Sequence, residues 1–299
     1  MIGRKHYSEC PVCGSRDINP LLTVKDHSVS LEDYVLWQCS HCTARFTQDV
    51  PDENSIGDYY KSENYISHTD SRKGFLNQAY QGVRAITLQQ KVKQLVKYTG
   101  LQQGTVLDVG CGTGSFLNAI KAKGWKVQGL EPDADARALA KKLYDIDVQE
   151  PVAIHSLGDK TADAITLWHV LEHIHDLHEQ LEQLKRILKP GGKLFVAVPN
   201  YHSLDSGAYK LHWAAYDVPR HLYHFSPRSM DMLMKQHKLS IVAKLPMWFD
   251  SFYVSILSSK YYKGKASYIS ALVNGLRSNM AAAANVDRCS SITYVIAST

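Results

Sequence analysis

Four cysteines near the amino terminus have the spacing of a metal site. Cys10 and Cys13 form one C-x-x-C pair, and Cys39 and Cys42 form a second. In a reducing cytoplasm two such pairs indicate a tetrahedral zinc site and not two disulfides. We therefore predict a zinc ribbon over residues 1–48, in which four sulfurs close the site and the metal is structural. The alternative is two chance pairs in a metal-free segment.

A second group of reactive side chains follows in the middle of the chain, where "TLWHVLEHIHDLH" (166–178) holds four histidines and a glutamate. If this segment were one helix, His169 and His173 would share a face and would indicate another metal site. The apolar run before His169 is typical of a strand, however, and a helix is expected to begin near His173. The metal interpretation is therefore disfavoured. We place His169 at the carboxyl end of a strand, where ligands of α/β sheets bind, with simple packing as its alternative, and we treat His173 as structural.

A glycine-rich loop lies in "VLDVGCGTGSFL" (106–117), directly after a strand pattern and before a helix pattern. Gly110, Gly112 and Gly114 lack the Cβ that would keep a ligand away from the backbone. Asp108 precedes them, and the G-x-G-x-G spacing differs from the G-x-G-x-x-G that suits a dinucleotide. Glu131 ends the next strand about twenty residues later, where a carboxylate can bind ribose hydroxyls. The alternative to a nucleotide site is an ordinary tight strand–helix turn.

Alternating strand and helix patterns surround these residues and predict a parallel sheet with helices on both faces. A helix pattern ends at Gly100, and a His- and aromatic-rich insert, 200–225, interrupts the alternation after the fifth strand. Ser226 and Pro227 begin a further helix. Residues 250–285 are expected to be mostly helical, and "SITYVIA" closes the chain as a strand. The five earlier strands are expected at 105–110, 126–131, 146–149, 163–169 and 193–199.

The glycine loop, Glu131 and the later "LKPGG" turn together resemble the class I S-adenosylmethionine-dependent methyltransferases, over roughly residues 76–299. The resemblance implies a Rossmann-like seven-stranded sheet that is mostly parallel, with an antiparallel last strand, and it implies methyl transfer. "WHVLEH" is similar to the segment of that family that borders cofactor and acceptor. The implied residues for binding S-adenosylmethionine are Asp108, Gly110, Cys111, Gly112, Gly114, Glu131, Pro132 and His169.

A further resemblance joins the ribbon to the insert. Zinc-containing C-methyltransferases of nucleotide-linked deoxysugars have a four-cysteine module, a Tyr/Ser-rich segment similar to "DYYKSENYISHTDS" in the connecting loop (49–75), and a shared motif after strand five. The matching residues of that motif are Tyr216, Asp217, His221, Tyr223, Phe225 and Ser226. The family's histidine acts as acid and base, which implies the same for His221; the alternative is a histidine that ties down the insert. Arg220 stands where the family has a glutamate, and it would either lower the pKa of His221 or bind an anionic acceptor.

These residues support methyl transfer to a small-molecule or carrier-linked acceptor, with the acceptor and the methylated atom (O, N or C) left open. One alternative is an RNA methyltransferase that grips RNA with its ribbon. The net charge of +5 is only mildly basic, and the ribbon has no dense Lys/Arg stripe, so a nucleic-acid partner is disfavoured. A non-catalytic cofactor-binding module is a further alternative, which the intact glycine loop and Glu131 argue against.

The sequence also predicts where the protein works. No apolar run approaches the roughly 20 residues that cross a bilayer, and the start, "MIGRKHYSEC", is unlike a signal peptide. We therefore expect a cytoplasmic protein without a transmembrane segment, and its oligomeric state stays open. Residues 252–285 are expected to form a packed helical lid, and peripheral contact with a membrane or a partner is the alternative.

Overall fold

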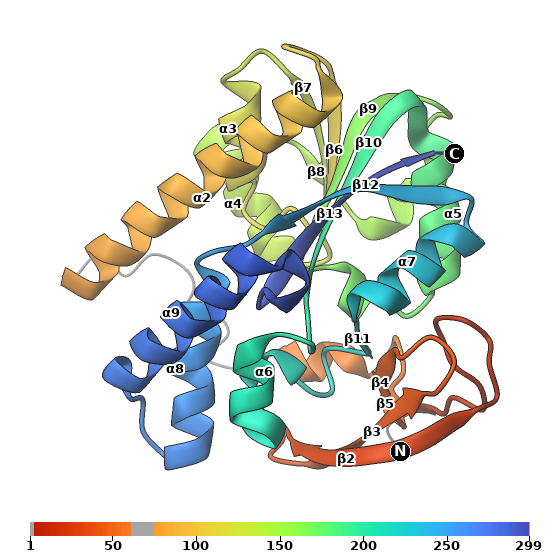
Figure 1. Ribbon diagram of the computed structural model, residues 1–299. Helices are drawn as coiled ribbons and strands as arrows, with labels where there is room; N and C mark the ends of the chain where they lie inside the picture. The colour runs from red at the N-terminus through yellow and green to blue at the C-terminus, as the bar shows by residue number, and fades with distance from the viewer. Residues whose placement is uncertain (1–2, 61–74, 299) are drawn as a thin grey trace.

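The computed structural model describes residues 3–60 and 75–298, and it contains a large twisted sheet with a smaller one beside it (Figure 1). The large sheet has seven strands. All of them run in one direction except β13, which is antiparallel to both of its neighbours. The predicted fold class is therefore confirmed. From edge to edge the strands are β12 (Leu239–Pro246), β13 (Ser291–Ser298), β10 (Leu188–Pro199), β9 (Ala162–Trp168), β6 (Thr105–Val109), β7 (Lys126–Leu130) and β8 (Val148–Gln149).

Helices cover both faces of this sheet, so its central strands β6 and β9 are buried along most of their length. In Figure 1, α2 and α3 lie on one side of the sheet, and α5 and α7 lie on the other. Ser226 caps α7 by a reciprocal pair of hydrogen bonds with Ser229, and Pro227 follows the cap as predicted. The helical segments are α2 (Phe75–Thr99), α3 (Ser115–Lys121), α4 (Ala134–Tyr144), η2 (Pro151–Ser156), η3 (Leu171–His173), α5 (Leu177–Ile187) and α7 (Pro227–Gln236).

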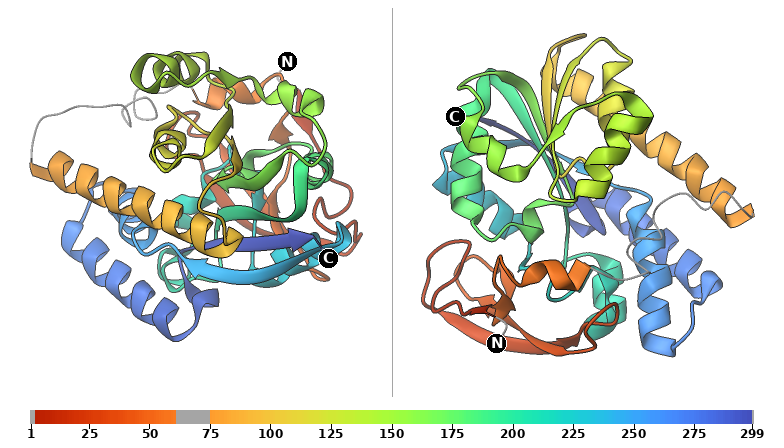
Figure 2. Two further views of the ribbon diagram at one scale, coloured as in Figure 1. Left: turned by 90° about the horizontal axis from the view of Figure 1, so that it is seen from above. Right: turned by 180° about the vertical axis from the view of Figure 1, so that it is seen from behind.

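A helical hairpin stands between β12 and β13 and extends away from the sheet (Figure 2). It consists of α8 (Asp250–Lys263) and α9 (Tyr268–Ala284), followed by η6 (Val286–Arg288). The two helices approach closely at Gly275, where a Cβ would lie 2.4 Å from Cδ1 of Phe252. The outer side of α9 leaves Ile269 and Met280 81% and 73% exposed. No helix within the described residues is long and apolar enough to cross a membrane.

The amino-terminal sheet includes a strand from far along the chain. Its four strands follow the order β11-β4-β3-β2, and β1 with β5 forms a separate pair. β11 belongs to the insert and pairs with β4, and the Thr47 N–H donates to the carbonyl of Leu222. The ribbon and the insert therefore share one sheet. These elements are β1 (Arg4–Lys5), β2 (Ile18–Lys25), β3 (Asp33–Cys39), β4 (Arg45–Thr47), β5 (Val50–Pro51), η1 (Ile56–Tyr60), α6 (Leu204–Tyr209), η4 (Lys210–His212), η5 (Ala214–Tyr216) and β11 (Tyr223–His224).

Most of the Tyr/Ser-rich part of the connecting loop, residues 61–74, lies outside the described residues.

Candidate cofactor and acceptor site

The glycine loop turns sharply between β6 and α3. Gly110, Gly112 and Gly114 all have left-handed backbones, with φ of 69°, 53° and 77°. Residues with a Cβ adopt this conformation only at a cost in free energy. At Gly110 a Cβ would also lie 2.4 Å from Cγ2 of Val170, whereas at Gly112 the space is open. The loop is therefore restricted to glycine on the Val170 side and leaves its backbone accessible at Gly112.

Glu131 ties the loop to the end of β7. Its Oε2 accepts a hydrogen bond of 2.8 Å from the Gly112 N–H, and its Oε1 accepts one of 3.0 Å from the Asp133 N–H. Burial raises the pKa of Glu131, and these two backbone hydrogen bonds oppose that rise. A carboxylate has about four lone-pair sites. Two remain for other donors, such as a pair of ribose hydroxyls.

Asp108 lies fully buried beneath the loop. The Thr166 hydroxyl donates to its Oδ1 at 2.5 Å. Burial raises the pKa of Asp108 to about 7, and the Thr166 hydrogen bond and the charge of Lys91 counteract part of the rise. Lys91 comes from α2, and its Nζ lies 4.2 Å from the centroid of the Trp168 ring. Nothing in the sequence singled out this lysine, because "KVKQLVKY" carries several lysines at unremarkable helical positions.

His169 follows β9 and has a left-handed backbone, with φ of 59°, a conformation that non-glycine residues adopt mainly where function or packing requires it. Its Nε2 lies 2.9 Å from Oδ2 of Asp250, and its Nδ1 lies 3.4 Å from Oε1 of Glu172. Burial alone would lower the pKa of His169, but the two carboxylates raise it to about 10. An imidazolium therefore stands between two carboxylates at the carboxyl edge of the sheet.

The segment after His169 meets the insert at His221. The ring of His221 packs edge-on against that of His173, with 4.6 Å between the centroids. Glu172 is fully buried beside them, and the three side chains each offer a ligand atom within 4.8 Å of the others. The sequence argument against a metal considered only His169 with His173. It missed this group because one of its members comes from the insert.

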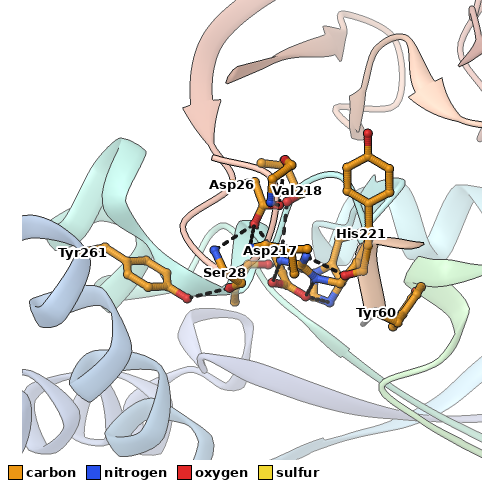
Figure 3. A network of polar contacts seen from close by, with 12 residues as sticks. Asp26, Ser28, Tyr60, Asp217, Val218, His221 and Tyr261 are labelled. Carbon is orange, nitrogen blue, oxygen red and sulfur yellow. Dashed lines mark hydrogen bonds and ion pairs between the residues drawn. The ribbon is translucent and has the colours of Figure 1, made fainter. Parts of the chain in front are cut away.

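Arg220 joins the insert to the ribbon and is almost completely buried. Its Nη2 lies 2.6 Å from Oδ1 of Asp217 and 3.1 Å from Oδ1 of Asp26, which belongs to the turn after β2. Its Nη1 donates to the carbonyl of Tyr59 at 3.0 Å. Figure 3 shows Asp26, Asp217 and His221 within this network. Burial lowers the pKa of Arg220, but Asp217 and Asp26 together raise it above its usual value. The guanidinium is thus occupied by protein acceptors, and Arg220 acts as a clamp between the insert and the ribbon.

The four ribbon cysteines converge as predicted. Sγ of Cys10 lies 3.6 Å from Sγ of Cys42, and Sγ of Cys13 lies 3.6 Å from Sγ of Cys39. All four sulfurs lie within 4.8 Å of one another. Tetrahedral Zn–S bonds of about 2.3 Å would separate the sulfurs by about 3.8 Å. The donor set and its spacing therefore fit a tetrahedral zinc ion.

The sequence profile of the methyltransferase domain family matches residues 80–244, which is more than half of the chain. The chain belongs to the methyltransferase domain family. The matched region runs from α2 to β12, and so includes the glycine loop, Glu131, His169 and His221. Membership confirms the methyltransferase class predicted from the glycine loop.

Individual relatives resemble only part of the chain. The ubiquinone biosynthesis O-methyltransferase of Hydrogenovibrio crunogenus is 25% identical over 118 residues, which cover 37% of this chain and 48% of that protein. The human mitochondrial ubiquinone biosynthesis O-methyltransferase is 28% identical over 163 residues, 49% of this chain and 44% of that protein. The matches thus span about half the length of these curated relatives. Among solved structures, the [4+2]-cyclase SpnF aligns with a TM-score of 0.52 at 15% identity, over 83% of this chain and 97% of that one, and therefore shares the fold.

Proposed function

We propose that this protein transfers the methyl group of S-adenosylmethionine to a small-molecule or carrier-linked acceptor. The observation that carries the proposal is the hydrogen bond of 2.8 Å between the Gly112 N–H and Glu131. It joins an accessible glycine backbone to a carboxylate with free lone pairs at the carboxyl edge of a parallel sheet, where ligands of such sheets bind. Family membership supports the same cofactor.

The residues proposed to hold the cofactor all border this edge. Glu131 would bind the ribose, and the loop would receive the amino-acid part of the cofactor. Asp108 would organise the loop from below. The full proposed set is Asp108, Gly110, Cys111, Gly112, Gly114, Glu131, Pro132 and His169.

The sulfonium of the cofactor supplies an activated methyl group, so the protein has to align the acceptor and remove its proton. The nucleophilic atom of the acceptor forms a bond to the methyl carbon while the carbon–sulfur bond breaks, and the electron pair stays on sulfur. His221 is the proposed base for the acceptor proton. Its Nδ1 donates to the carbonyl of Ala215 at 2.9 Å, which leaves Nε2 with the lone pair.

The acceptor side is built by the insert and the ribbon. Because the relatives described above carry the name O-methyltransferase, we propose oxygen as the methylated atom. Zinc held by Cys10, Cys13, Cys39 and Cys42 would stabilise the ribbon and take no part in the chemistry, because four sulfurs leave no open position.

Calorimetry tests the cofactor proposal. The protein should bind S-adenosylmethionine and S-adenosylhomocysteine and give no heat with nicotinamide dinucleotides. Glu131→Ala should weaken binding roughly 10- to 150-fold, because it removes hydrogen bonds to a charged group. Glu179→Ala, an exposed glutamate on α5, is the matched control and should bind normally. Tight dinucleotide binding without heat from S-adenosylmethionine would overturn the proposal. A methyl-transfer screen of cell extracts, read by mass spectrometry, would then identify the acceptor.

A further inference from the structure

Glu172 is a buried carboxylate with few polar contacts to the rest of the protein. Its side chain is completely buried, and neither Oε1 nor Oε2 has a hydrogen-bond partner among the described residues. The nearest cation is His169, whose Nδ1 lies 3.4 Å from Oε1 and which also pairs with Asp250. A buried carboxylate normally accepts several hydrogen bonds or binds a metal, because losing its hydration costs several kcal/mol. The side of Glu172 that faces the insert lacks such a partner.

The two histidines on that side are held in one tautomer. Nδ1 of His173 lies 3.0 Å from the carbonyl oxygen of Arg220, and Nδ1 of His221 lies 2.9 Å from that of Ala215. A carbonyl oxygen only accepts, so each Nδ1 carries the hydrogen, and in the neutral form of either ring the lone pair is on Nε2. Glu172, His173 and His221 each offer one ligand atom that lies within 4.8 Å of those of the other two.

We propose that Glu172, His173 and His221 bind a divalent first-row transition metal ion. Two imidazoles and one carboxylate are a common ligand set for Zn²⁺, Fe²⁺ and Co²⁺, whereas Mg²⁺ and Ca²⁺ prefer oxygen ligands. The ligand atoms lie within 4.8 Å of one another, and an ion at about 2.1 Å from each would bring them to roughly 3.4 Å. Small side-chain rotations close that difference.

The surroundings have the form that metal-binding histidines usually have. Such histidines donate their second ring nitrogen to a carbonyl or a carboxylate, which fixes the ring and raises its basicity. Here the carbonyl beneath His173 belongs to Arg220, the residue clamped by Asp26 and Asp217 (Figure 3). The ribbon thereby positions a ligand of the ion through the Arg220 backbone.

This inference rests on the proposed function and revises one role within it. Three protein ligands leave a coordination position open, as in catalytic metal sites. An acceptor hydroxyl bound there loses its proton to solvent more readily, because the ion lowers its pKa. The alkoxide oxygen then bonds to the methyl carbon as the carbon–sulfur bond breaks, with the electron pair left on sulfur. His221 is a ligand in this scheme, and the preferred acceptor carries a hydroxyl group.

Cobalt spectroscopy tests the site without turnover. The full-length protein, with its ribbon metal in place, is titrated with Co²⁺, and absorption and bound metal are measured. Thiolate-bound Co²⁺ absorbs intensely through sulfur charge transfer, so a nitrogen/oxygen site is distinguished from the ribbon. We expect one additional Co²⁺ per chain with a weak spectrum that lacks the sulfur band. Glu172→Gln should weaken its binding at least about 100-fold, since loss even of an outer partner costs 10- to 100-fold.

The chain offers a matched control in a second cluster, where His178, His237 and Glu182 contact one another. The double variant His178→Ala/Glu182→Gln should bind the additional Co²⁺ normally. Circular dichroism and S-adenosylmethionine affinity, unchanged in Glu172→Gln, would show that this variant folds; His173→Gln repeats the test at a second ligand. A wild type that binds no Co²⁺ outside the ribbon would overturn the proposal. Co²⁺ binding that survives both substitutions would also overturn the proposal. A wild type that binds the additional Co²⁺ but does not bind S-adenosylmethionine would instead contradict the proposed function.

Discussion

The proposed cofactor side and the proposed acceptor side of the site are built in different ways. On the cofactor side, β6, the glycine loop, α3 and β7 follow one another within Thr105–Leu130, and Glu131 comes next. The acceptor side draws on Asp26 of the ribbon, His173 after β9, and Arg220 and His221 of the insert. A local arrangement depends on short-range turn geometry, whereas the acceptor side depends on burying ion pairs between segments that are far apart in the sequence. The acceptor side should therefore be more sensitive to changes made at a distance.

Loss of the zinc proposed for the ribbon should have the largest effect. Cys10→Ser or Cys39→Ser removes one of four sulfurs, and the binding free energy of a structural zinc, about 10–16 kcal/mol, is also folding free energy. Metal analysis should show the loss of the tightly held zinc, and hydrogen exchange should show loss of protection in β2 and β3. Cys289→Ser, a buried cysteine outside the cluster, should retain the zinc. An equally protected ribbon in metal-free wild type would disprove the structural role.

Removal of the Arg220 clamp should have the second-largest effect. Arg220→Met leaves the buried carboxylate of Asp26 and the partly exposed carboxylate of Asp217 without their cation, which should lower the free energy of unfolding by about 3–5 kcal/mol. Arg228→Met is the control, because this exposed arginine also reaches the ribbon, through the carbonyl of His41, and should cost under about 1 kcal/mol. Urea unfolding measures both. Adding Asp26→Asn to Arg220→Met should restore part of the lost free energy of unfolding. If Arg220→Met and Arg228→Met lose equal amounts, Arg220 is not a clamp.

His221→Ala tests the acceptor side chemically. Single-turnover methyl transfer should slow roughly 10²–10⁴-fold, because either a base or a metal ligand is lost. S-adenosylmethionine affinity should stay within about twofold, since the cofactor side is built separately. His178→Ala, which changes an exposed residue of α5, should transfer at the normal rate. If His221→Ala only lowers the melting temperature, and its folded fraction transfers normally, then His221 is structural.

Asp108→Asn should give the smallest effect, and it depends on pH. Burial raises the pKa of Asp108 from 3.8 to about 7. The unfolded chain releases this proton at lower pH than the folded chain, so stability falls as pH rises from about 4 to about 7. The variant should lose this part of the slope and melt a few °C higher at pH 8, with little change at pH 4. Thermal melts across this range measure it, with Asp231→Asn, paired to Lys235 at the surface, as control. If the decrease in stability between about pH 4 and pH 7 persists in Asp108→Asn, Asp108 is not its cause.

Much of the fold could be predicted because the strand and helix patterns are strong. The glycine spacing predicted a loop that only glycine allows at Gly110, and the cysteine spacing predicted a cluster of sulfurs. The partners of Glu172 could not be predicted in this way, because its neighbour His221 is placed by the pairing of β11 with β4. Lys91 was missed for a similar reason, since only the packing of α2 brings it near Asp108.

The pairing of β11 with β4 also bears on how this protein can be divided or recombined. A ribbon with its own four sulfurs looks like a portable unit that could be deleted or exchanged between relatives. Here its sheet is completed by a strand from the insert, and its Asp26 neutralises an arginine of the other part. A graft that transfers the ribbon alone would leave an open sheet edge and a buried, half-paired guanidinium. Exchange between homologues should therefore succeed only when the ribbon and the insert are transferred together.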